Sequence, residues 1–169
     1  MAETLGSLID KLTIKDLRQY YLKNMLKPSR GKRSGGKQPK TKSFSGIILK
    51  KKLRLVGSQK KDLIEEIDNF ITAAVKGKVK IREDKLKLYN APEDMGRIPK
   101  SGSFGEIMTH LAQKNLELWH LEDEARRKDV NHAYIGKIKN KIDLANQQRN
   151  DLIDAMDELL EKCLKKNAS

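Results

Sequence analysis

The feature that most limits the possible folds of this chain is an internal repeat. Residues 4–22, TLGSLIDKLTIKDLRQYYL, align with residues 103–121, SFGEIMTHLAQKNLELWHL, at a constant spacing of 99. A later pair, QKKDLIEEID at 59–68 and QRNDLIDAMD at 148–157, aligns at a spacing of 89. The spacings differ by ten residues, so the first copy carries an insertion between its two segments.

Each copy is predicted to be a hairpin of two helices, because its apolar residues recur every three to four positions. Two hairpins with one apolar stripe per helix bury those stripes together. We therefore predict an all-α fold, a four-helix bundle of two tandemly duplicated helical hairpins, with a basic loop inserted in the first hairpin. The single domain spans residues 1–169, divided into a first copy at 4–76 with the insertion at 27–46, a crossover at 77–102 and a second copy at 103–165.

Local signals predict where helices begin and end. The run SFGE at 103–106 has the form of a capping box. A break in the first helix is predicted near Thr13, where a similar motif coincides with a change of apolar stripe. Asp129 or Asn131 is expected to cap the last helix, and Gly77 to end the second.

Positive charge is concentrated in the first copy. The chain of 169 residues has a net charge of +13, yet no acidic residue stands between Asp16 and Asp62. Fifteen lysines and arginines lie in this acid-free stretch, so the rest of the chain is close to neutral. This asymmetry indicates a polyanionic partner on one side of the molecule.

The basic loop and the second predicted helix form the expected contact surface. A loop rich in Gly, Ser, Pro and cations is suited to following a phosphate backbone, because counterion release rewards charge rather than shape. The predicted nucleic-acid-binding residues are Lys27, Arg30, Lys32, Arg33, Lys37, Lys40, Lys42, Lys50, Lys51, Arg54 and Lys61. A solvated loop that binds nothing is the alternative, and lipid headgroups are a weaker one.

One cation in each copy falls within the apolar face of a helix. Arg149 lies at the centre of the last predicted stripe, at the position aligned with Lys60. A buried guanidinium needs a carboxylate, and Glu122 is the predicted partner, while Lys60 is expected to pair with Asp16. The predicted buried polar network comprises Asn115, Glu122, Asn146 and Arg149. It either fixes the register of facing helices or forms a small ligand or catalytic site.

The sequence carries no motif for a known reaction. It has no Gly-rich phosphate loop, no G-x-S-x-G turn and no cysteine beside a base. In DLIDAMDE at 151–158, Asp151 and Asp154 are predicted to project roughly opposite the apolar stripe, which favours a solvated acidic face over a magnesium site. Cys163, the single cysteine, is predicted to be a small core residue. We therefore predict a non-enzymatic protein with no catalytic residue, no metal site and no cofactor.

The compartment is also constrained by the sequence. No apolar run approaches the roughly 20 residues needed to span a bilayer. The first residues, MAETLGSLIDKL, carry acids where a secretory signal has bases. We expect a cytoplasmic protein, or one within an intracellularly assembled particle, and not a secreted one.

Four segments resemble a known family. They are NLELWHLEDEARR at 115–127, NQQRNDLIDAMDELL at 146–160, IDKLTIKDLRQYY at 9–21 and DKLKLYNAPEDM at 84–95. Together they are similar to a bacterial all-helical family known only as a domain of unknown function, whose members have duplicated helical hairpins. The resemblance marks as motif positions Asn115, Glu122, Asp123, Arg126, Asn146, Arg149 and Asp151. It implies an all-α fold and no established activity, and the Lys-rich loop departs from its pattern.

The sequence thus favours a helical protein that binds RNA, DNA or a nucleoprotein assembly such as a ribosome or virion through its first copy. One alternative is a protein–protein interaction module, with subunits of a larger assembly as partners. A second alternative is an uncharacterised enzyme whose polar site contains Glu122 and Arg149.

Overall fold

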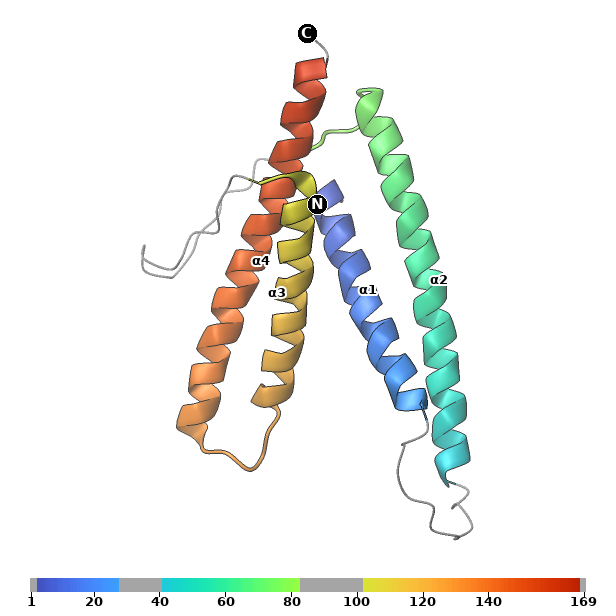
Figure 1. Ribbon diagram of the computed structural model, residues 1–169, viewed down its shortest axis with the longest axis vertical. Coiled ribbons are helices and arrows are strands. Elements are labelled where there is room, and N and C mark those ends of the chain that lie inside the picture. Colours follow the sequence, from blue (N-terminus) through green and yellow to red (C-terminus); the bar gives the residue numbers. More distant parts are fainter. Residues whose placement is uncertain (1–2, 28–40, 83–101, 168–169) are drawn as a thin grey trace.

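The computed structural model describes residues 3–27, 41–82 and 102–167, and this part of the chain is all-α. Two helical hairpins are formed, one by the first two helices and one by the last two (Figure 1). The predicted architecture, a bundle of four helices packed as two hairpins, is confirmed. The helices are α1 (Leu5–Leu26), α2 (Thr41–Val75), α3 (Phe104–Ala125) and α4 (His132–Asn167).

The two hairpins lean together at one end and diverge toward the other (Figure 1). Helix α1 stands between α2 and the second hairpin and contacts all three other helices. Helix α2 packs chiefly on α1, on the side away from α3 and α4. The beginnings of α1 and α3 therefore meet near the ends of α2 and α4.

The hydrophobic core lies at this meeting point. Its buried members come from three helices and are Leu5, Ile9, Ile107, Leu111, Leu152, Ile153 and Met156. From α2, Ile67 and Phe70 pack against the cluster and stay only partly buried. Burial of side chains of this size stabilises the fold by about 1.5–3 kcal/mol each, so the first turns of α1 are held firmly against α3 and α4.

Each long helix packs through a seam with alternating steps of three and four residues, which is the spacing of a coiled coil. The α2 seam is buried or half-buried and consists of Leu49, Leu53, Val56, Lys60, Leu63, Ile67, Phe70 and Ala74. The α4 seam occupies the aligned positions Ile138, Ile142, Ala145, Arg149, Leu152, Met156, Leu159 and Cys163. No helix in the described ranges is apolar over enough of its length to cross a membrane.

Cys163 is exposed, so its prediction as a core residue is wrong. It belongs to the α4 seam, but the last turns of α4 extend beyond the beginning of α3 (Figure 1). Position in a seam buries a residue only where a partner helix covers it.

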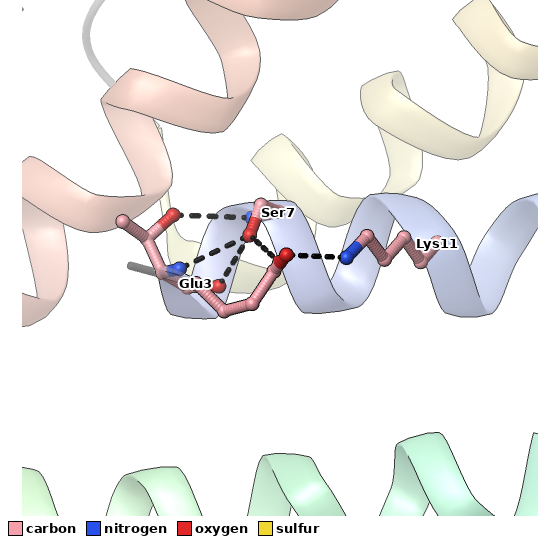
Figure 2. A network of polar contacts seen from close by, with 4 residues as sticks. Glu3, Ser7 and Lys11 are labelled. Atoms are coloured by element: carbon pink, nitrogen blue, oxygen red, sulfur yellow. Dashed lines mark hydrogen bonds and ion pairs between the residues drawn. The ribbon is translucent and has the colours of Figure 1, made fainter. Parts of the chain in front are cut away.

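Both hairpins begin with a capping box. The predicted box of α3 is confirmed: the Glu106 amide donates to the Ser103 side chain, and the Ser103 amide donates to Glu106. In α1, Thr4 and Ser7 make the same reciprocal bonds, and Glu3 and Lys11 extend the network (Figure 2).

The predicted break near Thr13 is wrong, because α1 runs unbroken from Leu5 to Leu26. The Thr13 hydroxyl donates to the Asp10 carbonyl oxygen at 2.8 Å within the helix. Its side chain is used in tertiary contacts rather than as a new helix cap.

Two other predicted helix ends are confirmed. The Tyr134 amide donates to Asn131 Oδ1 at 2.8 Å, so Asn131 is the residue that caps α4. Gly77 has a φ of 66°, a left-handed conformation that favours glycine, and the Lys78 amide donates to the Ala73 carbonyl.

The predicted insertion and crossover fall largely outside the described residues, which omit 28–40 and 83–101. Helix α2 begins at Thr41, so it starts inside the segment predicted as the insertion at 27–46. Residues 78–82, which have a weak alternating pattern, contain no strand.

Candidate polyanion interface and polar junction

Two sets of charged residues are candidates for function: the cations within the seams and the cations on the outer face of α2. Lys60 and Arg149 occupy the same place in the α2 and α4 seams. Lys60 forms an ion pair with Asp16 of α1, which confirms the predicted pairing. The side chains of Lys60 and Asp16 are 29% and 50% exposed, so water screens this pair.

Arg149 lies in a junction where α1, α3 and α4 meet. Its Nε is buried, has no hydrogen bond and is 3.9 Å from Asp10 Oδ1. Asn115 is 4% exposed, and its Nδ2 donates at 2.8 Å both to Asp10 Oδ1 and to Thr13 Oγ1. Asp10 therefore accepts from α3 and faces the guanidinium of α4.

The predicted partner of Arg149 is wrong. Glu122 is exposed and pairs with Arg126, one turn away on its own helix, at 3.3 Å. In the repeat alignment, Arg149 corresponds to Lys60 and Asn115 corresponds to Asp16, so Arg149 is expected to face Asn115. Glu122 lies two turns further along α3, about 10 Å from Asn115. Since Asn115 carries no charge, the acid comes from α1 instead.

Asn115 and Arg149 thus belong to one polar junction, whereas Asn146 and Glu122 do not join it. Asn146 is half-buried on α4, and its side chain makes no hydrogen bond to the junction residues in the described chain. Asp10 was missed because its partners are on other helices. The repeat contained a signal for it. Asp16, the acid that pairs with Lys60, aligns with Asn115, which is uncharged, so the carboxylate for Arg149 had to come from another helix.

The junction is built to hold helices together. Its hydrogen bonds join α1 to α3, and the ion pair joins α1 to α4. Asp10 is 8% exposed, so a reacting molecule has little access to its carboxylate. This geometry fits the register-fixing interpretation of the polar network.

The outer face of α2 carries a different kind of charge. Lys50, Lys51, Arg54 and Lys61 are all exposed, on the side that was predicted. Lys50, Arg54 and Lys61 are spaced at i, i+4 and i+11, which places them in one line along the helix. We refer to these three residues as the basic row. Within the described residues the basic row makes no ion pair.

The other predicted binding residues are described only in part. Lys27 is exposed just after α1. Lys42 belongs to the first turn of α2, but its side chain lies outside the described part. The same limit applies to the whole of Arg30, Lys32, Arg33, Lys37 and Lys40.

The turn between α3 and α4 shows how cations behave when acids are near. Arg127 bonds to Glu124 at 3.0 Å and to Asp129 at 2.7 Å. Hydrogen bonds from Arg127 lower the pKa of both carboxyls, and the bond from Tyr134 to Glu124 raises the pKa of the tyrosine. These charges are matched inside the protein, in contrast to those of the basic row.

A hollow of about 670 Å³ lies where the end of α2 and the residues after it face the end of α4. Its walls include Val75, Leu164, Arg82 and Lys165. Arg82 pairs with Glu158 at 2.9 Å and Lys165 pairs with Glu161 at 2.7 Å, so these two cations are matched within the protein. As to metals, the described side chains include no group of three or more His, Cys, Asp or Glu residues placed to hold an ion.

Comparison with known proteins bears on the second hairpin alone. No curated protein and no solved structure matches the chain. Residues 106–169, which cover α3 from its third residue onward and all of α4, match the model of a family described as a protein of unknown function (DUF4254).

Proposed function

We propose that this protein is a non-enzymatic binder of nucleic acid, and that the first hairpin makes the contact. The observation that carries the proposal is the basic row of Lys50, Arg54 and Lys61, exposed on α2 without an ion pair in the described chain. The phosphates of a polyanion could pair with these three cations. The cations of the second hairpin at Arg126 and Arg127 are already matched by acids.

The length of the basic row suits a nucleic-acid strand. Eleven residues of α-helix separate Lys50 from Lys61, a distance of about 16 Å. Phosphates along one strand of a duplex advance by about 3.4 Å each, so the row spans roughly five of them. Contacts of this kind position a backbone and do not read bases, so binding should depend weakly on sequence.

The loop predicted to be basic adds to this surface. It joins α1 to α2, and the exposed Lys27 at the end of α1 begins it. A particle such as a ribosome or virion offers the same phosphate chemistry. We place the protein in the cytoplasm, or in a particle assembled there, because nucleic acid is accessible in both.

The first hairpin is proposed to be a diverged copy of the family unit found at 106–169. The aligned spacings of 99 and 89 support a common origin for the two hairpins. A bacterial family of duplicated helical hairpins is the background from which this copy diverged. On this proposal, the first copy acquired the insertion and two cations of the basic row, Arg54 and Lys61, where the second copy has Asp143 and Asn150. With them it gained a function that its relatives need not share.

The test is binding to short RNA and DNA duplexes of arbitrary sequence, measured by fluorescence anisotropy at several salt concentrations. The variant Lys50→Glu, Arg54→Glu, Lys61→Glu changes the charge by six units. A matched control, Lys137→Glu, Lys139→Glu, Lys141→Glu, makes the same change at exposed residues of α4. We expect the α2 variant to lose at least tenfold in affinity at 50 mM salt and the control to lose much less.

The salt dependence gives a second readout. Loss of three phosphate contacts should reduce the slope of log K against log salt by about 2 to 3 for duplex DNA. Equal losses in both variants would show that only net charge matters and would overturn the assignment to α2. No binding of the wild-type protein at low salt would overturn the proposed function itself.

A protein–protein interaction module is the second candidate, and exposed apolar residues favour it. Ile47 and Leu55 of α2 are 63% and 58% exposed, beside the basic row. Ile47→Ser with Leu55→Ser would abolish binding to a protein partner and leave nucleic-acid binding nearly unchanged. The enzyme alternative has weaker support, since Glu122 and Arg149 are not brought together.

A further inference from the structure

Helix α4 has a second stripe, one residue to the side of its seam, that packs on the first turn of α1. Ile153 is 8% exposed and Asp157 is 1% exposed. Asp157 Oδ1 accepts a hydrogen bond of 2.7 Å from the amide of Gly6. Gly6 is the second residue of α1, where the amide has no partner within the helix. A Cβ at Gly6 would lie 2.5 Å from the Ile153 carbonyl oxygen, so only glycine allows this approach.

Helix α2 carries the same stripe at the aligned positions, but there it is exposed. Ile153, Asp157, Leu160 and Leu164 of α4 align with Ile64, Asp68, Ile71 and Val75 of α2. Asp68 is exposed, and Ile64, Ile71 and Val75 are 43%, 39% and 66% exposed. We call these four residues the α2 stripe.

The surface that would receive the α2 stripe is also present and open. Gly105 aligns with Gly6, is likewise the second residue of its helix and also follows a capping box. A Cβ at Gly105 would meet no atom within 4 Å. Met108, one turn further along α3, is 43% exposed. In the open arrangement, a glycine at position 105 is therefore not required for packing.

We propose that the α2 stripe is a docking surface for the first turn of α3 in the same chain. In the docked state Asp68 accepts the amide hydrogen of Gly105, as Asp157 accepts that of Gly6. Ile64 and Ile71 then cover Met108 and the neighbouring turn. The molecule alternates between this closed bundle, in which both hairpins make equivalent contacts, and the open arrangement of Figure 1.

The movement required is a tilt of α2 and not a refolding. Ile67 and Phe70, on the adjacent seam, already pack against the core cluster. In Figure 1 the end of α4 leans over the beginning of α3 toward α1, whereas the end of α2 stands away. A negative charge at a helix N-terminus is favourable, so Asp68 gains both a hydrogen bond and the field of α3 on docking. The proposal is independent of nucleic-acid binding.

The repeat provides a reference distance for the test, because the contact between α4 and α1 is the counterpart of the proposed contact between α2 and α3. Spin labels at Lys61 and His110, both exposed, report the distance between α2 and α3 in a Cys163→Ser protein. Labels at the aligned exposed positions, Asn150 and Lys11, report the contact between α4 and α1 that is already formed. We expect electron–electron resonance to show, for the first pair, a population whose distance matches that of the second pair.

Variants at the receiving glycine then identify the contact. Gly105→Leu should remove the short-distance population of the first pair and leave the second pair unchanged. Gly136→Leu, at an exposed glycine of α4 with no atom within 4 Å, is the control and should change neither distance. Asp68→Asn should reduce the short-distance population without abolishing it.

Three results would overturn the proposal. The first is that the Lys61–His110 pair shows only the distances of the open arrangement. The second is that Gly105→Leu leaves the distances of this pair unchanged. The third is that tenfold dilution with unlabelled protein removes the short distance, which would place the contact between two copies of the chain. Stability provides a check without labels. Docking predicts that Gly105→Ala lowers the unfolding midpoint in urea, whereas an always-open α3 predicts that it raises it.

Discussion

Helices α2 and α4 show how differently two related sequences are used in one molecule. Both pack through a seam of the same spacing with a cation at the same place, and both carry a second stripe with an aspartate. In α4 the second stripe is buried against α1, and Asp157 is 1% exposed. In α2 the corresponding surface is open, and the basic row continues it toward the start of the helix. The α4 copy thus holds the fold together, while the α2 copy keeps its outer face available.

The largest effect should come from the close approach of α1 and α4. Gly6→Ala places a methyl group 2.5 Å from a backbone carbonyl and 3.1 Å from Asp157 Oδ1, so the helices must separate. We expect the free energy of unfolding to fall by about 2–4 kcal/mol, from overpacking and the weakened hydrogen bond. Urea denaturation measures it.

Gly136→Ala is the matched control in the second hairpin. No atom lies within 4 Å of its Cβ position, so alanine should stabilise the exposed helix by up to about 1 kcal/mol. Effects of the same sign and size at the two glycines would contradict the packing of α1 on α4.

The next effect should come from the polar junction. Asp10→Ala removes one of the two acceptors of Asn115 Nδ2, which keeps its bond to Thr13, and takes away the carboxylate that faces the Arg149 guanidinium. We expect a loss of about 2–3 kcal/mol. Arg149→Met should cost less, about 1 kcal/mol, because the arginine is 28% exposed and Asp10 keeps its bond from Asn115.

A double-mutant cycle separates the ion pair from the hydrogen bonds. The coupling energy between Asp10→Ala and Arg149→Met should be about 1 kcal/mol or less, given their separation of 3.9 Å. Asp143→Ala, at an exposed position of α4, is the control and should stay within about 0.5 kcal/mol of wild type. A larger loss for Arg149→Met than for Asp10→Ala would show that the arginine is the centre of the junction.

Features that depend on neighbouring residues could be predicted from the sequence. The capping residues Ser103 and Asn131 and the turn at Gly77 are local in this sense, and so are the stripes that predict two hairpins. Features that depend on which helix lies opposite could not. Thr13 lies within α1 and accepts a hydrogen bond from Asn115 of α3, and Asp10 faces Arg149 from a helix of the other copy. The exposure of the α2 stripe could not be predicted from its sequence either, because the same pattern is buried in α4.

The pairing of Lys60 with Asp16 is the first copy's counterpart of the junction, and it should matter much less. Both side chains are partly exposed, at 29% and 50%, so solvent screens their attraction. We expect Asp16→Ala to lower the free energy of unfolding by less than about 1 kcal/mol. The loss should shrink further in 1 M salt, whereas that of Asp10→Ala should not, because Asp10 is buried.

The smallest expected change in stability concerns the two capping boxes, which differ in whether their third residue carries a charge. In α3 the third residue is Glu106, and the hydrogen bond from the Ser103 amide lowers its pKa; in α1 the same position is Ser7, which carries no charge. A carboxyl with a lowered folded pKa contributes stability above its unfolded pKa of about 4.3, and loses it as the pH falls through the folded value. Glu106→Gln should therefore be less stable than wild type at pH 7, with a difference that shrinks as the pH falls below the unfolded pKa and through the lowered folded pKa.

Thr4→Ala, which removes the cap of α1, is the comparison for this measurement. It should cost about 1 kcal/mol with little dependence on pH, because the lost bond joins the Thr4 hydroxyl to the Ser7 amide, and neither group titrates. Glu3, whose pKa is lowered by its bonds from Lys11 and Ser7, is present in both proteins. Both variants are compared with wild type by urea unfolding at pH 7 and at pH 3. A difference for Glu106→Gln that persists unchanged at pH 3 would contradict the assignment of this stabilisation to the charge of Glu106, because glutamine and a protonated glutamic acid have nearly the same shape. The loss would then come from the different hydrogen-bonding groups of the amide and the carboxyl, and the two capping boxes would stabilise their helices without any contribution from charge.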